Sequence, residues 1–147
     1  MKILIDADGC PVVDITIKVA GKYKIRTMII CDTSHVFNKE GAETIVVSKG
    51  ADSVDFKLVN MIEPGDIVIT QDYGLAAMSL SRKAIPLRQD GLIYSDNNID
   101  YLLNMRYISR KVRDSGGRFQ SIPKRTTNDD ISFQNSLESV LDGHNNL

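Results

Sequence analysis

The sequence is poor in the residues on which disulfide-rich and membrane proteins depend. Its 147 residues include two cysteines, two histidines and no tryptophan. Two cysteines are too few for a disulfide framework, and no apolar run approaches the roughly 18 residues of a membrane span. The start of the chain also lacks the basic flank, apolar stretch and small-residue cleavage site of a secretory leader. We therefore expect a cytoplasmic protein with no membrane partner, in which Cys10 and Cys31 are small, partly buried thiols.

The sequence contains no internal repeat and no low-complexity segment, and its length is that of one domain. The formal net charge is −1, but residues 106–125 carry seven lysines or arginines and one acid, Asp114. The near-neutral average therefore hides a basic patch. We expect a single domain over 1–147, with a core of about 1–117 and a C-terminal segment and helix over 118–147.

Five short runs rich in valine and isoleucine predict strands buried on both faces. They are KILID at 2–6, IRTMIICD at 25–32, AETIVVS at 42–48, DIVIT at 66–70 and IPL at 85–87. Four further segments are predicted to be helices, because they have apolar residues at helical spacing or are rich in good helix formers. They are 51–62, 73–84, 97–117 and 131–141. The segment 11–23 fits either a strand or a helix, but its opening proline and the need for a crossover favour a helix with Pro11 as its first residue. The pattern indicates a three-layer α/β sandwich with a mainly parallel central sheet of about five strands, plus C-terminal helices.

Aspartates follow two of the predicted strands. Asp6 and Asp8 come at the end of the first strand, and Asp72 follows the fourth. In an open parallel sheet, ligands bind beyond the carboxyl ends of the strands. If the first and fourth strands are neighbours, Asp6 and Asp72 lie side by side about 5 Å apart. Such carboxylates repel each other unless a cation lies between them.

A second pair, Asp52 and Asp55, lies three residues apart at the start of a predicted helix. A simple helix cap is an equally good explanation for Asp52. Aspartate oxygens with few histidines suit Mg²⁺ or Mn²⁺ rather than zinc. Arg106, Arg110 and Arg113 recur at helical spacing as a basic stripe that could follow a phosphate backbone, and Lys124 and Arg125 extend it. A solvated helix face is the simpler explanation of that stripe. Together these features predict phosphodiester hydrolysis by metal-bound water.

Several stretches together resemble one family over nearly the whole chain. They are DADGCPV, GADSVD, GDIVITQDYGLAAMSL, LRQDGLIYSDNNID and PKRTTNDDISFQNSL. This pattern resembles the YaiI/YqxD family of uncharacterised bacterial proteins. That family is similar in predicted fold to PIN-like nuclease domains and their NYN relatives, in which acidic residues hold Mg²⁺ or Mn²⁺ and cut RNA.

The resemblance implies catalytic and metal-binding roles for Asp6, Asp55 and Asp72, with Asp8 and Asp52 as neighbouring metal ligands. It also implies RNA or single-stranded nucleic acid as the partner. The sequence departs from the family at Gly9, where DADACP is common. It also lacks the further acid that PIN-like nucleases commonly carry after the aspartate of the fourth strand.

Two other functions remain open. Haloacid-dehalogenase-like phosphatases also open on a strand followed by Asp-x-Asp-Gly; Asp6 would be the nucleophile and Asp8 the acid/base. Thr33 or Ser34, Lys49 and Asp72 would complete that site, whereas Cys10 and Pro11 depart from its pattern. Alternatively, a PIN-like domain with an incomplete metal site could bind RNA or a protein without cutting. A homo-oligomer is also left open.

Overall fold

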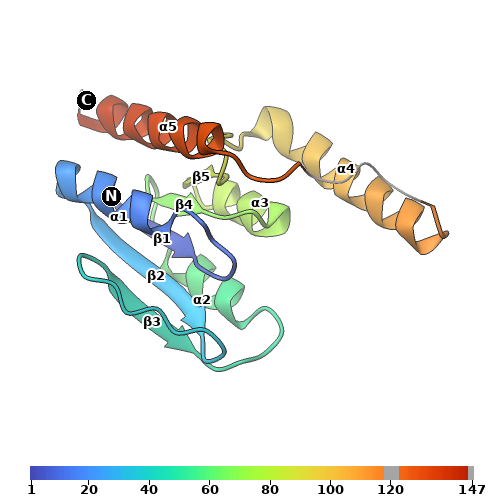
Figure 1. The fold of residues 1–147 in the computed structure, drawn as a ribbon, viewed down its shortest axis with the longest axis horizontal. Coiled ribbons are helices and arrows are strands. Elements are labelled where there is room, and N and C mark those ends of the chain that lie inside the picture. The colour runs from blue at the N-terminus through green and yellow to red at the C-terminus, as the bar shows by residue number, and fades with distance from the viewer. Residues whose placement is uncertain (118–122, 146–147) are drawn as a thin grey trace.

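A parallel sheet forms the centre of the fold (Figure 1). The computed structural model describes residues 1–117 and 123–145, and these contain five strands in the order β3-β2-β1-β4-β5, every neighbouring pair being parallel. The strands are β1 (Lys2–Asp6), β2 (Arg26–Asp32), β3 (Glu43–Val47), β4 (Ile67–Ile69) and β5 (Ile85–Leu87). The predicted sheet is confirmed, and so is the adjacency of the first and fourth strands. Strand order reverses at β1, which is where open α/β sheets bind ligands.

Two helices cover one face of the sheet. α1 (Val13–Tyr23) and α5 (Thr127–Asn145) lie along each other (Figure 1). Their apolar side chains pack against alternate residues of the strands, such as Ile3 and Ile5 of β1. Phe133 and Leu137 of α5 are fully buried there, so the last helix completes this half of the core.

The opposite face is covered by α2 (Ser53–Met61) and α3 (Tyr73–Ser81), which pack on residues such as Leu4 and Val68. The long helix α4 (Asp96–Asp114) packs on the outside of α3, and its far end extends away from the sheet (Figure 1). The sheet therefore lies between two helical layers, as the three-layer prediction required. None of the described helices has the length and apolar character to cross a bilayer.

The predicted helices are confirmed, although their ends differ by a few residues: α2 and α3 are shorter than predicted, α4 ends at Asp114, and α5 is longer. α1 begins at Val13 rather than at Pro11, because the carbonyl of Val12 is the first to accept hydrogen bonds, from the backbone N–H of Thr16 at 2.9 Å and from its hydroxyl at 2.7 Å. Two parts of the predicted C-terminal segment, residues 118–122 and 146–147, lie outside the described residues.

Candidate metal centre

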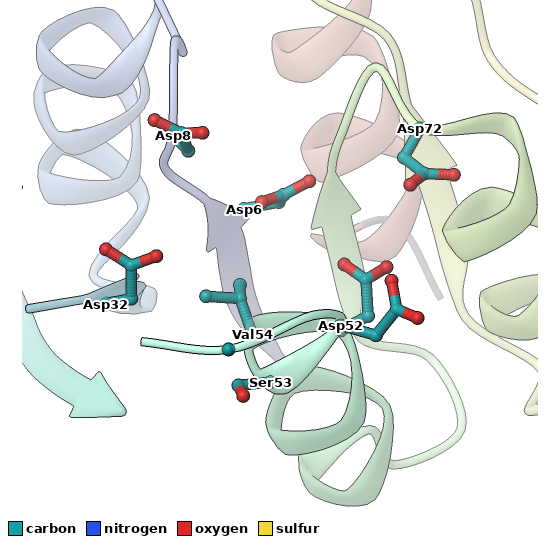
Figure 2. A pocket seen from close by; sticks show the side chains of 9 residues that line it. Asp6, Asp8, Asp32, Asp52, Ser53, Val54 and Asp72 are labelled. Carbon is teal, nitrogen blue, oxygen red and sulfur yellow. The ribbon is translucent and has the colours of Figure 1, made fainter. Parts of the chain in front are cut away.

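A pocket of about 250 Å³ opens at the carboxyl edge of the sheet (Figure 2). Six aspartates from the ends of β1 and β2 and the starts of α2 and α3 line it, and none of the described residues that line it is a lysine or arginine. They are Asp6, Asp8, Asp32, Asp52, Asp55 and Asp72. The fold thus brings together all five acids predicted from the sequence and adds one more.

Asp6 is held by a threonine of the neighbouring strand. The register pairs Ile5 with Ile69, so Thr70 follows opposite Asp6, and its hydroxyl donates to Asp6 Oδ2 at 2.9 Å. Thr70 is fully buried, and its hydroxyl oxygen also accepts from the backbone N–H of Asp72 at 3.0 Å. The expectation that Asp72 stands directly beside Asp6 is therefore wrong. β4 ends at Ile69, and Asp72 lies in the turn beyond Thr70.

Asp72 is the side-chain cap of α3. Its Oδ1 accepts from the backbone N–H groups of Gly74 at 2.8 Å and Leu75 at 3.1 Å. Arg106 Nη1, from α4, lies 3.7 Å from the same oxygen. A helix N-terminus and a guanidinium both attract a carboxylate. Asp72 is thus fixed in place at the mouth of the pocket.

Asp52 precedes α2 but does not cap it. The residue has the left-handed φ of +61° and its side chain makes no cap hydrogen bond. A positive φ is uncommon for a residue other than glycine, although aspartate tolerates it. The capping explanation left open for Asp52 therefore applies to Asp72 instead. In Figure 2, Asp6, Asp52 and Asp72 surround one space, and Asp8 and Asp32 lie on the other side of Asp6.

Burial, reinforced by neighbouring carboxylates, raises the pKa values of two aspartates. Burial raises the pKa of Asp55 to about 6, and the charges of Asp72, Asp6 and Asp52 add to the rise. Burial also raises the pKa of Asp6; the hydrogen bond from Thr70 opposes this effect, and the charges of Asp72 and Asp8 reinforce it. Both shifts show that negative charge is costly here, so a cation would relieve the repulsion.

The donor atoms fit a hard divalent cation. Carboxylate oxygens suit Mg²⁺ and Mn²⁺. Within residues 1–117 and 123–145, no three aspartate, glutamate, histidine or cysteine side chains are already arranged to hold a metal ion. Mg²⁺ commonly uses one or two carboxylates and keeps several waters. The pocket therefore fits an ion with a partly hydrated shell better than a dehydrated ion in a rigid cage.

The predicted basic residues do not all reach the pocket. Arg106, Arg110 and Arg113 are exposed on α4, and the helical rise places the last two roughly 6 and 10 Å beyond the first. Arg106 alone of these three forms an ion pair with a described pocket residue. Lys124 is exposed, whereas Arg125 binds Asp130 at the start of α5, with its Nε at 3.0 Å and its Nη2 at 2.6 Å.

Two residues of the site were not predicted from the sequence. Asp32 is the last residue of β2, and hydrogen bonds from the hydroxyl and backbone N–H of Ser34 lower its pKa. The rule that selected Asp6 also applies to Asp32, because β2 lies beside β1 at the same edge. Thr70 could have been found as the polar residue that follows the buried run of β4.

The fold and the pocket define an α/β protein with an acidic site at the switch point of a parallel sheet. The chain belongs to the YaiI/YqxD family, whose model, "Uncharacterized BCR, YaiI/YqxD family", matches residues 4–143. This confirms the resemblance.

Relatives named UPF0178 protein share much of the sequence. The protein of Exiguobacterium sibiricum is 49% identical, with 96% of each chain covered, and that of Ruminiclostridium cellulolyticum is 53% identical, with 93% of this chain and 90% of the relative covered. Among solved structures, a mutant of Rae1 (YacP) from Bacillus subtilis is similar at a TM-score of 0.45 and 15% identity, with 98% of this chain and 99% of that chain covered.

Proposed function

We propose that the protein is a divalent-metal-dependent nuclease that hydrolyses phosphodiester bonds of RNA or single-stranded nucleic acid. The observation that carries this proposal is the convergence of six carboxylates from four segments on one pocket. The family's resemblance to PIN-like nucleases, noted from the sequence, supports the same reaction and substrate class. The cofactor would be Mg²⁺ or Mn²⁺.

Asp6, Asp55 and Asp72 would hold the ion, with Asp8 and Asp52 beside them. When bound, the ion would supply an activated water and neutralise charge on the phosphate oxygens. Thr70 keeps the carboxylate of Asp6 aimed at the pocket by its 2.9 Å hydrogen bond. Asp55 has a pKa of about 6 in the metal-free protein, so its carboxylate is largely ionised at neutral pH and available as a ligand.

Arg106 would help an anionic substrate to approach this acidic site. Its guanidinium lies 3.7 Å from Asp72 at the mouth and its side chain is half-exposed. A phosphate could take over part of that contact, since guanidinium binds phosphate and carboxylate in the same geometry. Arg110, Arg113, Lys124 and Arg125 would contact the rest of the substrate backbone, as proposed from the sequence.

The phosphatase alternative has less support. It requires Lys49 as a cationic anchor and Thr33 or Ser34 as a phosphate donor, but none of these three lines the acidic pocket. The hydroxyl of Ser34 is instead bound to Asp32. A pocket of carboxylates repels a phosphate monoester unless cations are present.

A binding module without catalysis is the second candidate, and one observation favours it. Asp72 already serves as the cap of α3 and as the partner of Arg106, so it is only partly available as a metal ligand. In that case the protein would bind RNA without cleaving it.

Cleavage of single-stranded RNA in Mn²⁺ tests the proposal. We expect Asp6→Asn and Asp72→Asn to lower the rate by roughly 100-fold or more, because losing a charged ligand removes several kcal/mol of transition-state stabilisation. A chelator should abolish cleavage by the wild type.

The matched control is Asp142→Asn. Asp142 accepts a hydrogen bond at 2.5 Å from Tyr23, the last residue of α1, at the end of that helix remote from the pocket. The Asp142→Asn variant should therefore cut normally. Equal cleavage by all variants would mean that another enzyme in the preparation cuts the RNA. RNA binding without cleavage by the wild type would favour the binding module.

A further inference from the structure

A second pocket of about 520 Å³ adjoins the acidic one. It runs between α2 and α3 and shares Asp52, Asp55 and Asp72 with the acidic pocket. We call it the α2–α3 groove. Val59 and Leu75 contribute apolar lining. Its volume falls within the range of sites that hold a small organic molecule.

Phe56 is the most unusual residue of this groove. Leu58, two residues later on α2, is fully buried, whereas Phe56 is 69% exposed. The hydrophobic core does not explain this aromatic ring, because its side chain lines the groove instead of packing under the helix. Met78 of α3, also exposed, lines the groove as well. Exposed aromatic rings beside a charged channel are the stacking platforms of proteins that bind single strands.

Two arginines lie at opposite ends of the groove. Arg106 lies at the end shared with the acidic pocket, beside Asp72. Arg82 lies at the other end, directly after α3. Asp72 and Arg82 are separated by the length of α3, about 15 Å at the helical rise. The groove thus offers an apolar, aromatic wall with a cation at each end.

These features match one ligand chemistry. A nucleotide strand joins flat apolar bases to phosphates at regular intervals, and it would extend from the acidic pocket into the groove. A duplex offers no free base face in its interior, so Phe56 could stack only on an unpaired base. An acidic peptide could pair with the arginines, but its carboxylate side chains offer no flat ring to stack on Phe56.

We propose that the α2–α3 groove binds the nucleotides next to the cleaved phosphate, with an unpaired base stacked on Phe56 and a phosphate on Arg82. The inference rests on the proposed nuclease function and deepens it, because it selects single-stranded over double-stranded substrate. Phe56 and Arg82 are binding residues of the substrate strand in this arrangement.

Binding of a labelled single-stranded RNA, with Ca²⁺ in place of Mn²⁺, tests the groove without cleavage. We expect Phe56→Ala to weaken binding about ten-fold, the size of one lost base–aromatic stack, and Phe56→Tyr to keep it. Arg82→Ala should weaken binding and reduce the salt dependence by about one phosphate contact. Duplex RNA should bind the wild type more weakly, with no effect of Phe56→Ala.

Tyr101→Ala is the matched control, since Tyr101 of α4 is 64% exposed and does not line the groove. It should bind RNA like the wild type. The groove proposal is overturned if Phe56→Ala binds single-stranded RNA as tightly as the wild type does, or if Tyr101→Ala loses as much affinity as Phe56→Ala. It is also overturned if the wild type binds no RNA, or binds duplex RNA as tightly as single-stranded RNA.

The two proposals can fail separately. If Asp6→Asn abolishes cleavage while Phe56→Ala binds normally, the nuclease stands and the groove does not. If Phe56→Ala loses affinity while the wild type cuts nothing, the groove stands and the nuclease does not.

Discussion

At the scale of single residues, a hydroxyl rather than a carboxylate connects the two sides of the site. The hydroxyl of Thr70 donates to Asp6 Oδ2 at 2.9 Å and accepts from the backbone of Asp72 at 3.0 Å. Partners of this kind orient metal ligands, and losing one typically lowers metal affinity 10- to 100-fold. The position of Asp6 therefore depends on a residue that itself carries no charge.

Replacing Thr70 by valine keeps the shape of the side chain and removes the hydroxyl. We expect the pKa of Asp6 to rise further, because the bond that favours the ionised form is lost. Affinity for Mn²⁺, measured by calorimetric titration, should fall about ten-fold. Thr70→Ser should retain it. If the valine variant binds Mn²⁺ as the wild type does, Thr70 has no role in orienting Asp6.

At the scale of elements, the acidic residues at the two ends of the central strands have different surroundings. At the amino edge, Asp66 is 1% exposed and accepts from Lys2 Nζ at 2.6 Å, from the backbone N–H of Lys2 at 3.0 Å and from that of Glu63 at 2.8 Å. Each of these bonds satisfies a charge or a backbone group. At the carboxyl edge, Asp6 and Asp55 have raised pKa values, because burial and the charges of neighbouring aspartates disfavour their ionised forms.

Removing the acid at the amino edge should affect stability alone. Asp66→Ala leaves Lys2 Nζ with only the exposed Glu63 as a partner and removes the acceptor of two backbone N–H groups, which together should cost about 3–5 kcal/mol in the free energy of unfolding. Urea unfolding measures the loss, and Mn²⁺ affinity should not change. Glu63→Gln removes an ion pair to a carboxylate that is 79% exposed and should cost less than about 1 kcal/mol. Comparable losses in the two variants would contradict this division between the edges.

At the scale of the whole molecule, the acidic site links stability to pH and metal. An unfolded chain releases the proton of Asp55 near its ordinary pKa of 3.8, whereas the folded chain holds it up to about 6. Between these values the folded state binds more protons than the unfolded one. Stability without metal should therefore fall as pH rises from about 4 to about 6.

A divalent ion should reverse this trend, since it binds the ionised carboxylates. We expect Mn²⁺ to raise the melting temperature more at about pH 7 than at about pH 5, where Asp55 is largely protonated. Thermal unfolding with Mn²⁺ or with a chelator measures the difference. Asp55→Asn should weaken the pH dependence without metal. An equal increase at both pH values would show that the bound ion does not use Asp55.

Topology explains why so much of the site could be predicted from the sequence. Strand runs of valine and isoleucine fix which residues end at the carboxyl edge, so Asp6 and Asp72 could be assigned to that edge without coordinates, but the register that puts Thr70 opposite Asp6 could not be. Local backbone geometry could not be predicted in the same way. Asp52 and Asp72 both precede helices, but Asp52 has a φ of +61° and makes no cap hydrogen bond, whereas Asp72 caps α3. The groove depends on where the ring of Phe56 points, which helical periodicity does not determine.

The packing of α5 has a consequence for the order in which the molecule can assemble. The acidic pocket is built from residues 6–72, yet the face of β1 covered by α1 stays incompletely covered until Phe133, Leu137 and Leu141 dock. During synthesis these three residues are added long after the pocket residues. A growing chain would carry every acid of the site well before it could hold them in position, which ties any activity to the synthesis of α5.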